Sequence, residues 1–374
     1  MVGGNPIGLA VADFNGDGRP DFAVTSYSDD SLTLFLNPGD GGIDGGLGAG
    51  VVYDAGAQPR RPAAANLTMA GGAPSLIVPD YQPASGVIGG PIAIFSNTGL
   101  WGNGGDGGFA SPSEYYTPQL TCPESVAVVD LNQDGWPDLV FTDSCFRQLG
   151  VLMNLTGAGF GAPQMIGVTD DLNNLAIGDF NNDGWPDVVA VSASFNQIYL
   201  FTNSKDWSMG TMSGFATPVV YDDPGQPGGL AVADFNGDGW TDLAVVNLAT
   251  TSVDFVGGSV GLFLNTGDGG LTPQVQFTGA NLPQSVAVGD LNRDGLPDLV
   301  VAGDTGPAIY LNSGTWTNGG DGGFSGPFSP FADAGLGADA VSIVDYNGDG
   351  WLDIVMSFGV DAASAGVFIN TCGQ

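Results

Sequence analysis

The sequence predicts an all-β protein, a seven-bladed β-propeller built from four-stranded blades. Composition is the first observation: 63 Gly and 24 Pro stand among 374 residues, and only two Glu and one Lys are present. The second is a nine-residue loop of the pattern D-x-N-x-D-G-x-x-D that occurs six times. The third is a set of short apolar runs around each loop, which have the length and residue types of β-strands.

The loop repeats at a nearly constant spacing. Its six copies begin at Asp13, Asp130, Asp179, Asp234, Asp290 and Asp345. From the second copy onward they are 49 to 56 residues apart, and the 117 residues between the first two leave room for one more repeat. Residues 62–80 keep the apolar runs and a Gly-Gly pair but carry no carboxylate between Asn66 and Ser75. The sequence therefore predicts seven repeats, six with an intact loop.

Each repeat contains four apolar runs in the same order. One run precedes the loop (GLAVAD), a second follows it (DFAVTS), a third ends in Asn (LTLFLN), and a weaker fourth follows a Gly-rich turn (GVVYDA). Four strands in about 50 residues is the pattern of a propeller blade, whereas a two-sheet sandwich would show cleaner alternation and no such period. We expect a single domain with blades at about 7–57, 58–119, 120–169, 170–224, 225–280, 281–335 and 336–374.

The last repeat ends at its third apolar run, GVFIN. We therefore expect the seventh blade to have three strands. The strand that completes it would lie just before Met1, because propellers commonly close with one terminus completing the blade built by the other. The alternative is that these residues are an excised part of a longer chain.

The loop has the residue spacing of a calcium site. Oxygen-bearing side chains occupy positions 1, 3, 5 and 9, position 7 offers a backbone carbonyl, and Gly at position 6 permits a sharp bend. Ca²⁺ accepts roughly six to eight oxygens and would relieve the repulsion between three carboxylates. The loop is not an EF-hand, because the first copy has Val24 at position 12, where an EF-hand carries Glu, and no helix-forming stretch flanks it.

About six Ca²⁺ sites are expected, one in each intact loop. The expected ligands are Asp13, Asn15, Asp17, Arg19 and Asp21; Asp130, Asn132, Asp134, Trp136 and Asp138; Asp179, Asn181, Asp183, Trp185 and Asp187; Asp234, Asn236, Asp238, Trp240 and Asp242; Asp290, Asn292, Asp294, Leu296 and Asp298; and Asp345, Asn347, Asp349, Trp351 and Asp353.

These loops, with the FLN-x-GDGG pattern further along, resemble the FG-GAP/VCBS repeat family. That family includes the calcium-bearing propellers of integrin α-subunits and secreted bacterial and fungal propellers, some of them lectins. The resemblance covers essentially the whole chain and implies the propeller fold and calcium. It implies no particular activity, because the family shares a scaffold and not a reaction. Integrin-type loops often have Asp at position 3, where all six loops here have Asn.

Near-identical loops in six blades favour a structural role for calcium over a bridge to an external ligand. Trp at position 7 of four loops is likewise expected to pack on the blade edge, with sugar stacking as the alternative. Trp101, Trp207 and Trp316 lie in the Gly-rich turns at less regular positions. For these three, contact with a ligand is the minor alternative to packing.

The net charge and the absence of histidine exclude several classes of function. A formal net charge of −34 argues against binding to nucleic acid or an anionic membrane. No apolar run reaches the ~18 residues of a membrane span, so no membrane insertion is expected. The absence of His excludes Ser-His-Asp and Cys-His catalysis. Paired carboxylates could still cleave a glycosidic bond, but no catalytic constellation stands out and we expect a non-enzymatic protein.

Two of the three cysteines lie symmetrically about the loop at 130–138. Cys122 precedes the strand that enters this loop and Cys145 follows the strand that leaves it. They are expected to face each other at the open end of the hairpin and to form a disulfide, with two buried thiols as the alternative. A disulfide implies an oxidising compartment, so we expect a secreted or cell-surface protein. Cys372 is left over.

The two rims of the propeller differ in sequence. The first and third turns of every blade, on one rim, repeat closely, whereas the second turns and the connections between blades vary, as binding loops on a rigid scaffold do. Three basic residues, Arg60, Arg61 and Arg147, fall on this variable rim. They are expected either to pair with nearby acids or to form a subsite for an anionic group. The nearby acids are Asp29, Asp30, Asp54 and Asp80, and the expected stacking surfaces of a subsite are Tyr27, Tyr81 and Phe146.

The sequence therefore predicts a calcium-stabilised extracellular binding module, lectin-like or adhesive, that recognises a carbohydrate or protein through the variable rim. The alternatives are a polysaccharide-active enzyme that uses carboxylates and a structural unit of a surface assembly.

Overall fold

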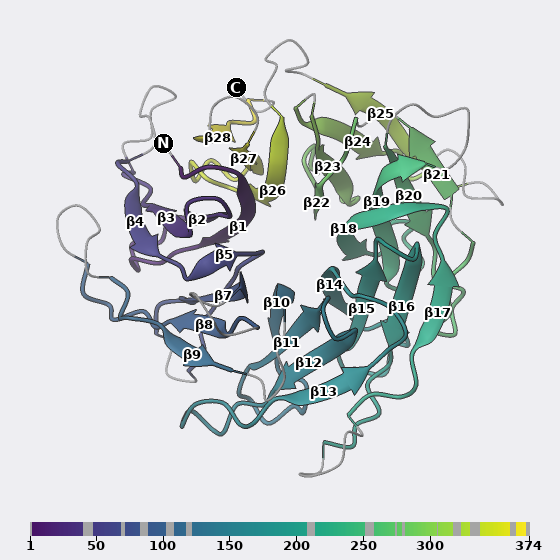
Figure 1. Cartoon of the computed structure of the whole chain (residues 1–374). Helices are drawn as coiled ribbons and strands as arrows, with labels where there is room; N and C mark the ends of the chain where they lie inside the picture. The colour runs from purple at the N-terminus through teal and green to yellow at the C-terminus, as the bar shows by residue number, and fades with distance from the viewer. Residues whose placement is uncertain are drawn as a thin grey trace.

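The computed structural model is a ring of seven antiparallel sheets around a central axis (Figure 1). It describes residues 2–39, 48–68, 72–82, 89–101, 108–116, 122–207, 214–250, 258–273, 275–278, 281–304, 306–316, 323–329, 337–359 and 364–371. Within these residues, no helix has the length and apolar character needed to cross a membrane. The predicted all-β, seven-bladed propeller is confirmed.

Strands follow one another outward from the axis in each blade. Blades 1 to 3 contain β1 (Pro6–Ala12), β2 (Asp21–Ser26), β3 (Ser31–Phe35) and β4 (Val51–Asp54); β5 (Ala57–Pro59), β6 (Ala63–Ala65), β7 (Ser75–Gln82), β8 (Ile92–Phe95) and β9 (Ser113–Tyr115); and β10 (Pro123–Val129), β11 (Asp138–Asp143), β12 (Gln148–Leu152) and β13 (Gln164–Gly167).

Blades 4 to 7 repeat this order. They contain β14 (Asn174–Gly178), β15 (Asp187–Ser192), β16 (Gln197–Phe201) and β17 (Val219–Asp222); β18 (Gly225–Ala233), β19 (Asp242–Thr250), β20 (Ser259–Phe263) and β21 (Val275–Thr278); β22 (Ser285–Gly289), β23 (Asp298–Ala302), β24 (Ala308–Asn312) and β25 (Phe324–Phe328); and β26 (Ala338–Val344), β27 (Asp353–Phe358) and β28 (Ser364–Phe368).

The second strand of a blade is buried along its whole length, as in β2, β11 and β15. This burial explains the almost continuous apolar runs that follow the loops, because both faces of the strand pack against neighbouring blades. Seven apolar clusters lie between adjacent blades, one at each interface. In the cluster that closes the ring, Val2, Phe22 and Phe35 of blade 1 pack with Val355 of blade 7.

Blade 2 departs from the others at its inner edge. Its first strand is split into β5 and β6, and both pair with β7. The strand β7 begins at Ser75, at the place where the second strand of every other blade begins with Asp. The repeat that lacks the acidic loop in sequence is therefore present as a blade.

Blade 7 has three strands in the described residues, in the order β26-β27-β28. The other blades each carry a fourth strand outside the third. The expectation of a three-stranded last blade is confirmed for this part of the chain, and Figure 1 shows this blade between blades 1 and 6.

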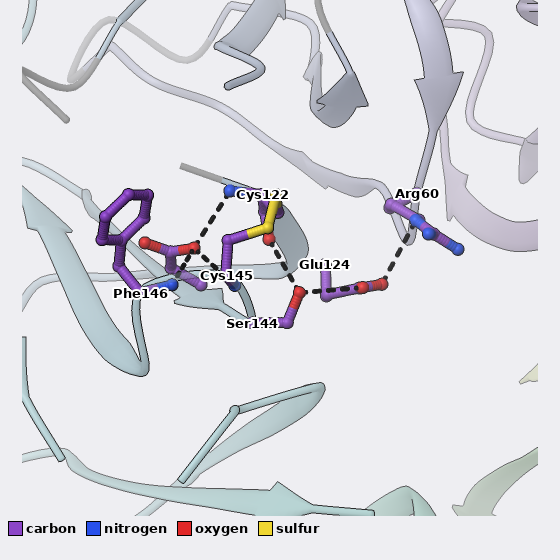
Figure 2. The surroundings of a disulfide bond; sticks show 7 residues. Arg60, Cys122, Glu124, Ser144, Cys145 and Phe146 are labelled. Atoms are coloured by element: carbon purple, nitrogen blue, oxygen red, sulfur yellow. Dashed lines mark hydrogen bonds and ion pairs between the residues drawn. A yellow bond between two sulfur atoms is a disulfide. The ribbon is translucent and has the colours of Figure 1, made fainter. Parts of the chain in front are cut away.

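The predicted disulfide between Cys122 and Cys145 is present, with 5.3 Å between the two Cα atoms (Figure 2). The two residues flank the hairpin of β10 and β11, in which Pro123 pairs with Asp143. A carboxylate oxygen of Asp143 accepts hydrogen bonds from the backbone N–H groups of Cys122 and Cys145. The bond therefore closes the end of the hairpin away from the acidic loop. Cys372 lies outside the described residues.

Replacing both bridged cysteines by Ser should lower the free energy of unfolding by about 3 kcal/mol, the loop-closure value for a separation of 23 residues. Chemical denaturation of the double variant measures this loss, and Cys372→Ser is the matched control. Equal denaturation midpoints for the double variant and the control would contradict the expectation.

Candidate functional site

All six acidic loops adopt one backbone conformation, with left-handed residues at positions 4 and 6. Position 6 is Gly in every loop, with φ between 82° and 87°. At Gly18 an added Cβ would meet no atom within 4 Å, so glycine is required there by its φ and not by space.

Position 4 is Gly in three loops and Gln133, Asn182 or Arg293 in the others, also with positive φ. These three side chains reach the loop of the next blade. Gln133 Nε2 donates to the carbonyl of Gly184 at 2.6 Å, and Asn182 Nδ2 donates to the carbonyl of Gly239 at 2.9 Å. The Arg293 guanidinium lies 4.3 Å from the centre of the Trp351 ring. Position 4 therefore links the loops of blades 3 and 4, of blades 4 and 5, and of blades 6 and 7.

The side chains at positions 1, 3 and 5 accept hydrogen bonds from backbone N–H groups of the turn that they enclose. In the loop of blade 3, Asp130 accepts from the N–H groups of Asp134 and Gly135 at 3.1 and 2.8 Å. Asn132 accepts from the N–H of Asp134, and Asp134 accepts from the N–H of Trp136. The other five loops repeat the bond from position 6 to position 1 at 2.7–2.9 Å. The sequence-predicted ligands at positions 1, 3 and 5 are thus brought together around one turn.

The Asp at position 9 is placed differently, since its side chain is completely buried in all six loops. In blade 3, Asp138 Oδ2 accepts from the N–H of Leu131 at 3.0 Å, and Oδ1 accepts from the N–H of Asn154 at 2.8 Å. One carboxylate therefore joins the start of the loop, the start of the second strand and the end of the third. The equivalent pairs are Asp21 with Asn37, Asp187 with Asn203, Asp242 with Asn265, Asp298 with Asn312 and Asp353 with Asn370.

Burial raises the pKa of these carboxyl groups. The pKa of Asp138 rises to about 7, mainly through desolvation and further through the charges of Asp134 and Asp130. Desolvation likewise raises the pKa values of Asp21, Asp187 and Asp242 to about 6. Backbone hydrogen bonds oppose the shift in each case without cancelling it. The charged form of the position-9 Asp is therefore disfavoured first by burial and further by repulsion from the neighbouring loop carboxylates.

The chain offers few positive charges to offset this repulsion. It has six basic side chains in all. Within the described residues, Arg19 pairs with Asp17 at 2.6 Å and Lys205 with Asp183 at 3.1 Å, and the loops of the other four blades have no ion pair to Lys or Arg. Protonation or an external cation would neutralise them.

The donor set suits a hard cation, although the side chains are not arranged as a finished metal centre. Among the described residues, no group of three or more His, Cys, Asp or Glu side chains is disposed to hold a metal ion. In each loop the acids at positions 1, 5 and 9 are turned onto backbone N–H groups. An ionised carboxylate has about four lone-pair sites, so these bonds leave acceptor capacity for a cation. Calcium in these loops therefore stays a prediction.

The Asn just beyond the third strand of each blade, which is the last residue of that strand in blade 6, links the blade to the previous one. Its Nδ2 donates to the backbone carbonyl of the position-2 residue of the preceding loop, for example from Asn203 to Leu131 at 3.0 Å and from Asn265 to Phe180 at 2.7 Å. The same bond occurs at all seven interfaces with distances of 2.7–3.4 Å. It includes the closing interface, where Asn37 bonds to Tyr346. We call this set the asparagine ring.

Four of the tryptophans pack on turns of their own blades, as expected. A Cβ added to Gly157 would lie 2.5 Å from the Trp136 ring, so this ring covers the third turn of its own blade. Trp101, Trp207 and Trp316 meet a Phe edge-to-face, with ring centres 5.2–5.7 Å apart. Each of these three rings also covers a glycine of its turn.

At the other end of the blades, Arg60 lies between two tyrosine rings. Its guanidinium carbon is 4.7 Å from the centre of the Tyr27 ring and 4.1 Å from that of Tyr81. Its Nε lies 3.2 Å from a carboxylate oxygen of Glu124, which is buried and accepts a hydrogen bond from Ser144 (Figure 2). The two tyrosines expected near Arg60 are therefore beside it. Its partner Glu124 is an acid that sequence reasoning did not single out.

The other residues of the variable rim are spread over blades 1 to 4. The pKa of the partly buried Arg61 is lowered by desolvation, which Glu124 opposes. Arg147 donates to the carbonyl of Thr169 and lies 5.4 Å from the centre of the Phe195 ring. Phe146 and Phe195, in the second turns of neighbouring blades, are 42% and 47% exposed. The acids expected to pair with the arginines, Asp29, Asp30, Asp54 and Asp80, accept hydrogen bonds from backbone N–H groups.

Seven like blades, six of them with the same acidic first turn, define a propeller of tandem repeats. A family model described as an FG-GAP-like repeat matches residues 179–245, 248–301 and 290–356. These residues, just under half of the chain, therefore carry FG-GAP-like repeats, as their motif indicated. The match does not distinguish VCBS or integrin-type members. No curated protein matches the chain significantly in sequence.

Solved structures share the fold at low sequence identity. BBS1N, solved in complex with ARL6DN, aligns with a TM-score of 0.63 and 13% identity over 100% of this chain and 95% of its own. A lectin from Agrocybe aegerita that recognises non-reducing terminal N-acetylglucosamine aligns with a TM-score of 0.51 and 16% identity over 97% and 94%. A Lactobacillus plantarum protein aligns with a TM-score of 0.56 and 14% identity over 86% and 83%. At these identities the likeness shows the fold alone.

Removing one member of the asparagine ring should weaken the whole propeller. Asn265→Ala leaves the buried carbonyl of Phe180 without its donor, so the free energy of unfolding should fall by about 1–3 kcal/mol. Denaturant titration measures the loss, and Asn281→Ala, at an exposed residue, is the control. A loss no greater than that of the control would show that the ring contributes nothing.

The raised pKa values predict that, in the presence of a chelator, the protein becomes less stable as the pH rises. Folded Asp138 titrates at about 7, whereas an unfolded Asp titrates at about 3.9, so the folded state binds more protons between these values. The contribution of these groups is complete below about pH 4 and is lost as the pH rises through about 7. With chelator, the melting temperature should be higher at pH 5 than at pH 8. With millimolar calcium the order should reverse, because protons compete with the cation. A chelated protein that is less stable at pH 5 would refute this reading.

Proposed function

We propose that this chain is a calcium-stabilised, extracellular binding module that recognises a carbohydrate or a protein through its variable rim. The proposal assigns the loops a structural role and assigns no catalysis. The secreted or cell-surface location rests on the disulfide and is part of the proposal. A lectin and a partner-bound protein among the solved structures of this fold are consistent with a binding role.

The observation that carries the proposal is the contrast between the two ends of the blades. The six loops repeat one set of internal hydrogen bonds, whereas the opposite end presents aromatic and guanidinium groups that differ from blade to blade. The exposed rings of Phe146 and Phe195 lie on neighbouring turns, with Arg147 against the second. Such surfaces suit the apolar face of a sugar or an aromatic side chain, and arginine suits a carboxylate or sulfate.

Calcium dependence can be tested by counting bound ions. Titration calorimetry should give about six Ca²⁺ per chain, and each site would add ~2.7 kcal/mol of stability at a hundredfold excess over its dissociation constant. Asp234→Asn removes one charge from the loop of blade 5 and should lower the count by one. Asp222→Asn, at an exposed acid outside the loops, should leave it unchanged. Identical melting curves in calcium and in excess chelator would exclude the structural role.

The binding role can be tested with a glycan array in millimolar calcium, followed by affinity measurement on any hit. Phe146→Ala combined with Phe195→Ala should weaken binding at least about tenfold, because exposed aromatic anchors dominate such contacts. Val52→Ala with Val219→Ala removes exposed apolar side chains from outer strands and is the matched control. The Phe146 and Phe195 substitutions are a better test than Arg60→Ala, because Arg60→Ala would also leave Glu124 buried without its partner. Unchanged affinity in the Phe146 and Phe195 variant would show that the ligand does not bind at the variable rim.

A further inference from the structure

Arg60 lies where three blades meet on the variable rim. It stands between β5 and β6, where the first strand of blade 2 is split. Its backbone N–H donates to the carbonyl of Pro79 at 2.8 Å, and its own carbonyl accepts from the hydroxyl of Thr25 in blade 1 at 2.8 Å. The backbone of Arg60 is therefore held by blade 1 and by its own blade, at the place where its side chain meets Glu124 of blade 3.

Three side chains fix the guanidinium group of Arg60. The ring centres of Tyr27 and Tyr81 lie 4.7 and 4.1 Å from its central carbon, and a carboxylate oxygen of Glu124 lies 3.2 Å from its Nε. Contacts with two aromatic rings and a buried acid restrict the rotamers that a surface arginine samples freely. An anion that binds here would therefore not bear the entropic cost of ordering the arginine. We call these four residues the Arg60 clamp.

The clamp keeps unused hydrogen-bonding groups. A guanidinium carries several N–H donors, and none of those of Arg60 makes a hydrogen bond to another residue in the part of the chain that the structure describes. The Arg60 side chain is nevertheless 20% exposed, and Tyr27 and Tyr81 are partly exposed. Neither tyrosine hydroxyl has a hydrogen-bond partner among the described residues. The fold thus orders these donors without using them.

The charges around the clamp favour an anion. Burial raises the pKa of Glu124, and the charges of Arg60 and Arg61 are the main opposing effects, whereas Asp171 acts in the opposite sense and least. Two guanidinium groups therefore act on one buried carboxylate, which leaves a local excess of positive charge in a chain of net charge −34. That net charge disfavours a polyanion. It has little effect on one anionic group at the clamp, because exposed charges beyond about 8 Å are screened at physiological ionic strength.

We propose that the Arg60 clamp binds the carboxylate of an acidic sugar, such as a uronic acid residue. This inference rests on the proposed function and names the class of ligand that the variable rim recognises. The two carboxylate oxygens accept from the guanidinium fork of Arg60, a planar geometry that an ammonium group does not match. The hydroxyls of Tyr27 and Tyr81 bond to the ring hydroxyls of the sugar, which a peptide carboxylate does not carry. Figure 2 shows Arg60 and Phe146 on either side of the disulfide, so the clamp is a subsite separate from the exposed phenylalanines.

A pair of glycosides tests the recognition of the carboxylate. Methyl glucuronide and methyl glucoside share one ring and differ in one group, a carboxylate in the first and a hydroxymethyl group in the second. In a ligand-observed NMR titration of the unaltered chain, the glucuronide should bind at least about tenfold more tightly, because hydrogen bonds between charged groups are stronger than neutral ones. Equal affinities, or no binding of the glucuronide, would overturn the inference.

Arg60→Lys keeps a positive charge beside Glu124 and removes the fork, so it should weaken binding of the glucuronide at least about tenfold. Arg293→Lys is the matched control, because it makes the same change at another arginine in contact with an aromatic ring, at the calcium-loop end of the blades. Melting curves establish that both variants are folded. Equal affinity of the two variants for the glucuronide would contradict the role of Arg60.

Two further outcomes separate this inference from the proposed function. A short glycine peptide with a free C-terminal carboxylate should bind more weakly than the glucuronide, and tighter binding would assign the clamp to a protein partner and overturn the inference. A glycan-array ligand that depends on Phe146 and Phe195, found together with equal affinities for the two glycosides, would overturn the inference and leave the proposed function in place.

Discussion

The propeller depends on one buried carboxylate in each of six blades. The Asp at position 9 has no exposed surface, and its two oxygens accept hydrogen bonds from backbone N–H groups of the loop and of the Asn at the end of the third strand or just beyond it. Burial of a charged group is costly unless hydrogen bonds compensate it, and here those bonds fix three chain segments at once. The side chain of the same Asn then bonds to the previous blade. The hydrogen bonds that hold a blade together and those that join it to the previous blade thus share one Asp-Asn pair.

The same arrangement explains why the acids are concentrated where they are. The position-9 Asp holds the loop close to the start of the second strand, and the side chains at positions 1, 3 and 5 then enclose the turn. Their charges have few basic partners in a chain of net charge −34. A cation that neutralises the loop would therefore stabilise the pairing beneath it. In blade 2, Ser75 takes the place of the Asp and its hydroxyl accepts from the N–H of Asn97, so that blade keeps the connection without the charge.

The sequence was sufficient for features that are local or periodic. The number of blades follows from the spacing of the loops, and the disulfide follows from the symmetry of Cys122 and Cys145 about one hairpin. The asparagine ring was missed although the Asn recurs in all seven third strands, because its acceptor lies in the preceding blade. The ion pair of Arg60 with Glu124 was missed for a related reason, since it joins neighbouring blades across many residues of sequence. The acidic loops could be placed from sequence, but the complete burial of position 9 depends on how the strands of the blade pack around it.

Hydrogen exchange of individual backbone amides tests the role of the buried carboxylates most directly. The N–H groups of Leu131 and Asn154, both bonded to Asp138, should exchange only through global unfolding. The N–H of Asn97, bonded to the Ser75 hydroxyl at 3.2 Å, should be less protected than its equivalents in the other blades. Exchange of the Leu131 and Asn154 amides at the rate of exposed turns would contradict the account.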